Sequence, residues 1–230
     1  MKDTIIVSGG DIQRDFALDF LRNRIERIGR EKLCLIAADR GLEFFMENHL
    51  LPDVAVGDFD SLSPRGEEFL KDLSTVEVIR LKPEKDDSDT QCAVNLAIRQ
   101  GTKRIEILGA TGRRVDHLIA NLGLLILASQ TGVSLALVDQ YNYMTLAENG
   151  KVLEKSSQFG KYVSFFAIGG AVKGLCLEGF KYLLDGYDLS LLDCGLTVSN
   201  EIQEEQARVT YESGTLLMIQ STDRYPAKDK

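Results

Sequence analysis

The sequence has no tryptophan and only two histidines, so a histidine-rich metal site is excluded. Its cysteines (Cys34, Cys92, Cys176 and Cys194) lie far apart and form no CxxC pair. This spacing disfavours a zinc site or a disulfide framework and favours buried free thiols. No apolar run approaches the roughly 18 residues that a membrane-spanning helix needs, and the opening MKDTIIVSGGD is unlike a signal peptide. We therefore expect a cytoplasmic protein that does not bind membranes.

Positively charged residues are also fewer than negatively charged ones. The chain of 230 residues has 27 Lys and Arg against 35 Asp and Glu, a formal net charge of −8. Proteins that bind the nucleic-acid backbone are usually basic, so nucleic acid is disfavoured as a partner. An acidic protein can still bind an anionic nucleotide where metal ions or local Arg and Lys offset the repulsion.

The first 140 residues alternate β-branched runs with helical stretches. Residues 4–8, 33–37, 76–81, 104–108 and 133–138 are the expected strands, and residues 11–28, 42–48, 64–73, 88–100 and 115–129 are the expected helices. A further apolar run, at 54–56, leads into an acidic loop. Strands separated by helices predict a mostly parallel sheet with helices packed on it, an α/β domain.

The pattern changes after Asp139. Short alternating segments follow at 141–147, 152–155, 162–167, 171–177, 207–211 and 216–220, with turn residues between them and no long helical period. This favours a C-terminal antiparallel β-sandwich. We expect two domains, 1–140 and 141–225.

Ligands of open parallel sheets bind at the carboxyl ends of the strands, in the loops that lead into the following helices. Taken by themselves, the first two of these loops do not distinguish a binding site from an ordinary turn. Gly9 and Gly10 allow close backbone approach to a phosphate or ribose, and Asp11 is equally well a helix N-cap. In the second loop, Asp39 precedes Arg40. Asp39 either binds a ribose or a metal ion, or caps the following helix.

The third loop, Gly57 to Ser61, has the sequence GDFDS. In an extended segment residues two apart point the same way, so Asp58 and Asp60 are expected to project together while Phe59 packs inward. Paired carboxylates with few other ligands suit Mg²⁺, which retains waters and takes substrate phosphates. The alternative is a solvated acidic turn.

The fourth loop leads into a helix with the sequence KDDSDTQ at 85–91. Ser88 and Gln91 fit a capping box. That role does not account for Asp86, Asp87 and Asp89, which we interpret as further metal ligands. Lys82 and Lys85 would balance charge or hold a phosphate.

The fifth loop, GATGRRVDH at 109–117, joins a strand to a long helix. Backbone N–H groups at a helix start together with arginine form an anion site. Asp116 and His117 either contribute to this site or are ordinary first-turn residues. Taken together, the five loops predict a divalent-metal site that holds a polyphosphate, and hence phosphoryl-type transfer.

These residues resemble the thiamine pyrophosphokinase family. The resemblance rests on ADRG (38–41), GDFDS (57–61), KDDSDTQ (85–91), GATGRRVDH (109–117) and SNE (199–201), in the family's order. It implies Mg²⁺-dependent transfer of pyrophosphate from ATP to thiamine, which gives thiamine diphosphate and AMP. It also implies an N-terminal α/β catalytic domain, a thiamine-binding β-sandwich, and a homodimer with active sites at the interface. The family usually has a glycine where this chain has Arg113.

The resemblance also implies roles for individual residues. The expected catalytic residues are Asp58, Asp60, Asp89, Asp116 and Arg114, and the expected metal ligands are Asp58, Asp60, Asp86, Asp87 and Asp89. The residues expected to contact ATP or thiamine are Gly9, Asp39, Arg40, Lys85, Gln91, Thr111, Gly112, Arg113, His117, Ser199 and Asn200. Within this set, Asp116 or a metal-held aspartate is a possible base, Arg114 and Lys85 neutralise phosphates, and Ser199 and Asn200 hold the thiamine pyrimidine.

Two other functions fit parts of the sequence. Asp58 and Asp60 loosely resemble the DxD nucleophile motif of haloacid-dehalogenase phosphatases, in which Asp58 would be phosphorylated. Alternatively, the protein binds a nucleotide or thiamine as a sensor without turnover. The phosphatase function leaves the fourth and fifth loops unexplained. A sensor that binds without turnover would not need so many carboxylates at one place.

Overall fold

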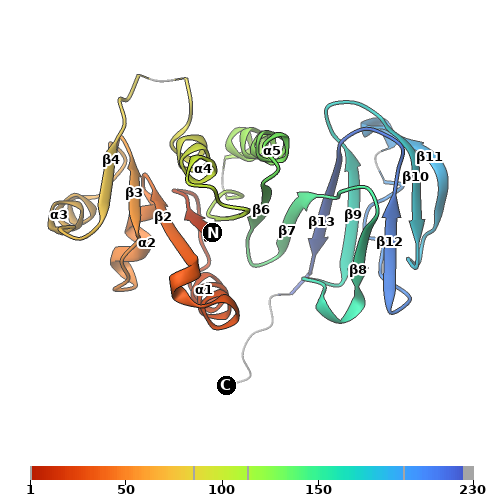
Figure 1. The fold of residues 1–230 in the computed structure, drawn as a ribbon, viewed down its shortest axis with the longest axis horizontal. Helices are drawn as coiled ribbons and strands as arrows, with labels where there is room; N and C mark the ends of the chain where they lie inside the picture. Colours follow the sequence, from red (N-terminus) through yellow and green to blue (C-terminus); the bar gives the residue numbers. More distant parts are fainter. Residues whose placement is uncertain (1, 85, 113, 194, 225–230) are drawn as a thin grey trace. The chain divides into compact units, whose positions relative to one another are not determined.

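The computed structural model describes residues 2–84, 86–112, 114–193 and 195–224 (Figure 1). The chain folds into two compact units, 1–140 and 141–230. Each unit is described by itself below.

The first unit is built on a parallel sheet. Its strands are β1 (Asp3–Val7), β2 (Leu33–Ala38), β3 (Val54–Gly57), β4 (Glu77–Arg80), β5 (Arg104–Leu108) and β6 (Ser134–Val138). They lie in the order β4-β3-β2-β1-β5-β6, and each neighbouring pair is parallel. The central strands β1 and β2 are apolar and almost wholly buried, as expected of a sheet covered on both faces.

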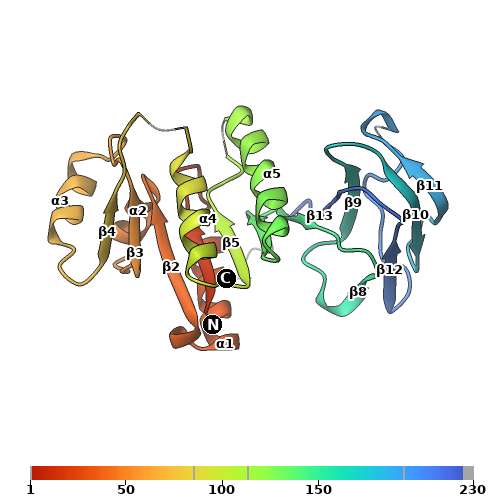
Figure 2. The same cartoon turned by 45° about the horizontal axis from the view of Figure 1, so that its top comes forward.

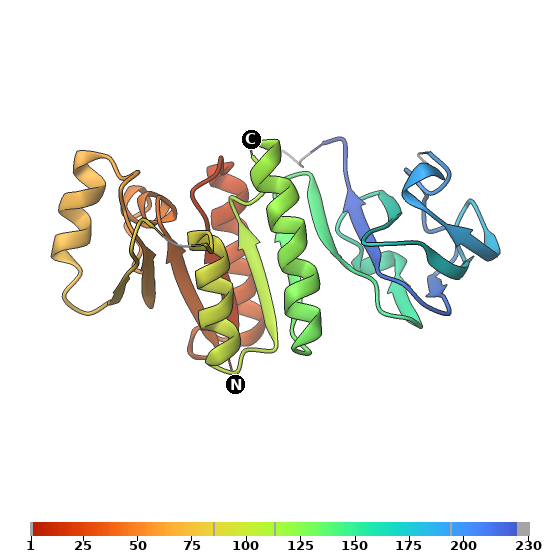
Figure 3. The same cartoon turned by 90° about the horizontal axis from the view of Figure 1, so that it is seen from above.

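Helices cover both faces of this sheet. They are α1 (Arg14–Ile28), α2 (Gly41–Glu47), α3 (Pro64–Asp72), α4 (Asp89–Arg99) and α5 (Val115–Gln130), with a short 3-10 turn, η1 (Arg30–Lys32), before β2. Figure 3 shows α4 and α5 in front of the sheet and α1 behind it, and Figure 2 shows α4 and α5 side by side. The predicted α/β class of this unit is confirmed.

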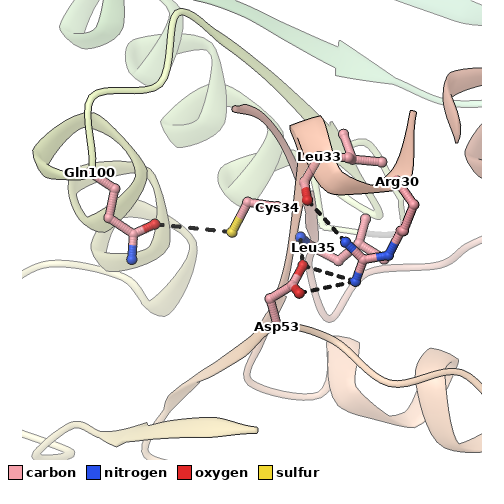
Figure 4. Close-up of polar contacts among 6 residues, drawn as sticks. All are labelled: Arg30, Leu33, Cys34, Leu35, Asp53 and Gln100. Atoms are coloured by element: carbon pink, nitrogen blue, oxygen red, sulfur yellow. Dashed lines mark hydrogen bonds and ion pairs between the residues drawn. The ribbon is translucent and has the colours of Figure 1, made fainter. Parts of the chain in front are cut away.

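Polar contacts join the amino ends of β2 and β3 (Figure 4). The Asp53 carboxylate accepts hydrogen bonds from Arg30 Nη2 at 3.0 and 3.1 Å and from the Leu35 N–H at 2.7 Å. Nearby, Cys34 Sγ lies 4.0 Å from Gln100 Oε1, and burial, followed by the charge of Asp53, raises the pKa of this thiol. Cys34 is thus a buried core residue whose environment favours the protonated thiol.

The second unit consists of antiparallel strands. These are β7 (Asn142–Leu146), β8 (Lys151–Glu154), β9 (Tyr162–Ala167), β10 (Val172–Glu178), β11 (Leu184–Leu189), β12 (Gln206–Thr210) and β13 (Leu216–Ser221), with 3-10 turns η2 (Lys155–Ser157) and η3 (Leu191–Asp193). Strands β7, β13 and β9 pair in that order, and β11, β10, β12 and β8 form a four-stranded sheet in that order. Phe165 of β9, Met218 of β13, Leu175 of β10 and Val209 of β12 belong to one core. The predicted C-terminal antiparallel arrangement is confirmed.

Several local predictions need correction. The first helix begins at Arg14, not at residue 11, because Gln13 is its N-cap and its side chain accepts the Phe16 N–H. Asp11 therefore does not cap it. The sequence pattern did not predict strand β11, because its sequence, LDGYDL, is mostly exposed and interrupted by glycine. Of the cysteines, only Cys34 is buried among the described residues, where the sequence had suggested buried thiols throughout.

Within the described ranges, none of the helices combines the length and the apolar character needed to cross a membrane.

Candidate functional site

Three aspartates from two strand ends come together in the first unit. Asp39 follows β2, and Asp58 and Asp60 follow β3; one carboxylate oxygen from each lies within 4.8 Å of the others. Strands β2 and β3 are parallel neighbours, so their carboxyl ends meet at one edge of the sheet. The predicted pair is therefore part of a cluster that also contains Asp39.

Asp39 is held in an uncommon backbone conformation. Its φ is +48°, in the left-handed region, and its N–H donates to the Val56 carbonyl at 2.8 Å. Its Oδ2 accepts a hydrogen bond from Ser61 Oγ at 2.6 Å. Its Oδ1 is buried and accepts no hydrogen bond from any part of the chain that the structure describes. The alternative of Asp39 as a helix cap is wrong, because the N-cap of α2 is Arg40.

The loop between Asp58 and Asp60 is a turn and not an extended strand. Phe59 has φ +63° and is buried, and the Asp60 N–H donates to Asp58 Oδ1 at 3.3 Å. The reason that the sequence suggested for the paired carboxylates, alternation along an extended segment, is therefore wrong. A left-handed residue between the aspartates brings them together, and such strain in a bulky residue is typical of functional loops.

Next to the cluster, Glu43 joins helix α2 to the start of α3. The Ser63 N–H donates to Glu43 Oε1 at 2.7 Å, and Arg40 Nε donates to Glu43 Oε2 at 3.3 Å. Burial alone would raise the pKa of Glu43, but the hydrogen bonds from Ser63 and Arg40 outweigh it and lower the pKa. Sequence reasoning gave no role to Glu43 or Ser61; the only signal for Ser61 was its place directly after the acidic pair.

The fourth loop caps α4. Ser88 is the N-cap and accepts the Gln91 N–H at 3.2 Å, as the capping box predicts. The Gln91 side chain instead donates to Asp87 Oδ1 at 2.6 Å, and Asn95 Nδ2 donates to Asp87 Oδ2 at 3.3 Å. The three-carboxylate cluster found among the described residues does not include Asp86, Asp87 or Asp89. Their metal contacts remain predictions, and Lys85 lies outside the described residues.

The first and fifth loops pack backbone against backbone. A Cβ on Gly10 would lie 2.3 Å from the Gly109 carbonyl oxygen, and one on Gly112 would lie 2.8 Å from the Asp11 nitrogen. Only glycine permits these approaches. Gly9 likewise approaches Arg40, where a Cβ would lie 3.0 Å from the Arg40 Cβ. The glycines thus serve contacts between loops.

The remaining candidates of the fifth loop lie around an exposed ion pair. Arg114 Nε and Nη2 donate to the two carboxylate oxygens of Asp116 at 3.1 and 2.5 Å. These hydrogen bonds lower the pKa of Asp116 to about 2. His117 is exposed, and its N–H donates to Asp116 Oδ1 at 3.0 Å. Thr111 is half-buried, and Arg113 lies outside the described residues.

Ser199 and Asn200 belong to the second unit. Ser199 is exposed with φ +56°, and its N–H donates to Ser164 Oγ at 2.9 Å. Asn200 is buried; its Oδ1 accepts the N–H groups of Tyr182 and Glu201 at 2.9 Å, and its Nδ2 donates to the Tyr182 carbonyl at 2.7 Å. The Asn200 amide therefore fixes the backbone at Tyr182.

Two family descriptions match the chain. "Thiamin pyrophosphokinase, catalytic domain" matches residues 25–137, and "Thiamin pyrophosphokinase, vitamin B1 binding domain" matches residues 151–216. Among curated proteins, thiamine pyrophosphokinase of Bacillus subtilis (strain 168) is 29% identical over 188 residues, which are 82% of this chain and 87% of that protein.

Solved structures agree with these matches. The crystal structure of thiamine pyrophosphokinase from Bacillus subtilis has a TM-score of 0.83 at 28% identity and covers 97% of this chain and 100% of that one. A thiamin pyrophosphokinase family protein from Enterococcus faecalis has a TM-score of 0.75 at 30% identity, with the same coverage. The resemblance predicted from the five motifs is confirmed, and the chain belongs to the thiamin pyrophosphokinase family.

Proposed function

We propose that the protein transfers the pyrophosphoryl group of ATP to the hydroxyl of thiamine with Mg²⁺, and that the products are thiamine diphosphate and AMP. The enzyme class and the two substrates are those of the family. The observation that carries the metal dependence is the convergence of Asp39, Asp58 and Asp60 at the carboxyl ends of β2 and β3. Oxygen ligands of this kind suit Mg²⁺, which retains waters and binds substrate phosphates.

The donor set fits a divalent cation. Three carboxylates close together repel one another unless a cation lies among them. Asp39 Oδ1 is buried and has no hydrogen-bond donor among the described residues, and a bound cation would compensate it. We assign Asp39, Asp58 and Asp60 as the principal ligands, with Asp89, Asp86 and Asp87 as further candidates across the site. When bound, Mg²⁺ supplies Lewis-acid stabilisation of the charge on the phosphates.

Arg114 is proposed to neutralise the phosphates of ATP. Its guanidinium is exposed at the start of α5 and is oriented by both oxygens of Asp116. Because the pKa of Asp116 is about 2, its carboxylate has little affinity for the hydroxyl proton of thiamine at neutral pH. We therefore assign Asp116 to hold Arg114. A loose phosphoryl-transfer transition state needs little help from a base.

The thiamine contacts are proposed to come from the second unit, at the loop of Ser199 and Asn200. The exposed Ser199 is the candidate for direct contact with the pyrimidine. Asn200 is buried and bonded to the backbone of Tyr182, which supports an indirect role in holding the surface at Tyr182.

We also propose a homodimer with active sites at the interface. Exposed apolar side chains are concentrated between residues 182 and 198: Tyr182, Leu183, Tyr187, Leu191, Leu192, Leu196 and Val198. Leu192 is 88% exposed. Apolar surface of this kind marks contacts between proteins, and a second copy of the chain is the proposed occupant. Sedimentation of the wild type as a dimer, and of Leu192→Asp as a monomer, would support this; a monomeric wild type would refute it.

The test of the reaction is an assay for AMP with ATP, Mg²⁺ and thiamine. AMP released only when thiamine is present supports the proposal. An acyl-phosphate trapped on Asp58 would instead support the phosphatase, and binding of both ligands without AMP would support the sensor.

A further inference from the structure

Ser61 connects the two loops that carry the acidic cluster. Its Oγ donates to Asp39 Oδ2 at 2.6 Å, a short hydrogen bond to a carboxylate. Ser61 follows directly after Asp60, so the bond ties the loop of Asp58 and Asp60 to the end of β2. The two oxygens of Asp39 are thereby distinguished: Oδ2 has a donor, and Oδ1 has none among the described residues.

The backbone near both ends of this hydrogen bond has an uncommon conformation. Asp39 and Phe59 both have left-handed φ values, which are uncommon for residues other than glycine and persist where the surroundings enforce them. The Asp39 N–H is bonded to Val56, one residue before Gly57 begins the acidic loop. The hydrogen bond from the Ser61 hydroxyl restricts rotation of the Asp39 carboxylate.

We propose that Ser61 is a positioning residue for the cation: its hydroxyl fixes the Asp39 carboxylate so that Oδ1 is available to the metal before the metal binds. The inference rests on the proposed function, in which the cluster holds Mg²⁺. Partners that orient metal ligands typically contribute about 10–100-fold to metal affinity. Ser61 itself need not touch the metal or the substrates.

The test measures Mn²⁺ binding to the full chain from the EPR signal of free Mn²⁺, with and without α,β-methylene-ATP. Ser61→Ala is expected to weaken Mn²⁺ binding about tenfold or more. Ser61→Thr, which keeps the hydroxyl, is expected to restore binding. In steady-state assays with Mn²⁺, Ser61→Ala is expected to raise the KM for the metal and to leave the KM for thiamine unchanged.

Ser63→Ala is the matched control. The Ser63 hydroxyl caps α3 by accepting the Gly66 N–H at 3.2 Å and also bonds Glu43, but it makes no described contact with the three aspartates of the cluster. This variant is expected to lower the unfolding midpoint and to leave Mn²⁺ binding unchanged.

The possible outcomes separate the inference from the proposed function. Equal Mn²⁺ affinity of Ser61→Ala and the wild type overturns the inference alone, as does failure of Ser61→Thr to restore binding in a folded protein. If the wild type binds no Mn²⁺ even with the nucleotide analogue, the acidic cluster is not a cation site. This result would contradict both the proposed Mg²⁺ dependence and the inference about Ser61.

Discussion

Gly57 lies against Asp39 so closely that no side chain fits between them: a Cβ on Gly57 would stand 2.9 Å from the Asp39 Cα and 3.1 Å from its nitrogen. Both atoms belong to backbone, which cannot move aside as the end of a flexible side chain can. The third loop therefore reaches Asp39 because its first residue is glycine.

Replacement of Gly57 by alanine is expected to push the two loops apart. The overpacking should cost about 1–3 kcal/mol of unfolding free energy, measured by urea denaturation, and should weaken Mn²⁺ binding. Gly123→Ala is the control, because nothing lies within 4 Å of a Cβ at this exposed position in α5. There alanine should stabilise the protein by about 0.5–1 kcal/mol. Full stability of Gly57→Ala would contradict the close approach.

Phe59 provides a test of backbone strain. Phe59→Ala and Phe59→Gly both remove a buried ring, over which the Arg80 guanidinium lies 5.6 Å from the centroid. Either truncation should cost about 3–5 kcal/mol. Because φ is +63°, the glycine variant should be the more stable of the two by about 1 kcal/mol in urea denaturation. An alanine variant as stable as the glycine variant would mean that Phe59 is not left-handed.

The Arg114–Asp116 pair predicts a pH dependence. The carboxyl carbon of Asp116 should titrate in an NMR experiment near pH 2 in the wild type. In Arg114→Gln it should titrate near the ordinary value of about 3.9. Because the pKa is lower in the folded state, the pair stabilises the protein above about pH 4, and this contribution disappears as the pH falls toward 2. A wild-type titration near pH 4 would show that the pair does not form.

Asn200 predicts a stability change that is independent of any ligand. In Asn200→Ala the N–H and the carbonyl of Tyr182 lose their partner, the buried Asn200 amide, and unfolding free energy should fall by about 2 kcal/mol or more. Asn149→Ala is the matched control, since Asn149 is exposed and accepts one hydrogen bond, from the Tyr211 N–H at 3.0 Å. It should cost less than about 1 kcal/mol. Similar costs for the two variants would contradict the assigned role of Asn200.

The sequence predicted what depends on local pattern. Buried apolar runs such as β2 predicted the parallel sheet, and the aspartates that follow them were placed at its carboxyl edge. The left-handed φ of Phe59 has no sequence signal, because bulky residues rarely adopt it, and that of Asp39 cannot be told from the other aspartates of these loops. The bond from Ser61 to Asp39 depends on tertiary structure, since 22 positions separate these residues. The pairing of β2 with β3, which the structure gives, was therefore needed to place Asp39 in the cluster with Asp58 and Asp60.

The central claim is that carboxylates from separate strand ends hold one divalent cation against the phosphates of ATP. The most direct test is the rate of AMP formation by Asp60→Asn with saturating ATP, thiamine and Mg²⁺. Loss of several kcal/mol of transition-state stabilisation should lower the rate by about a hundredfold or more, with an unchanged circular dichroism spectrum. A folded Asp60→Asn protein with near wild-type turnover would contradict the claim.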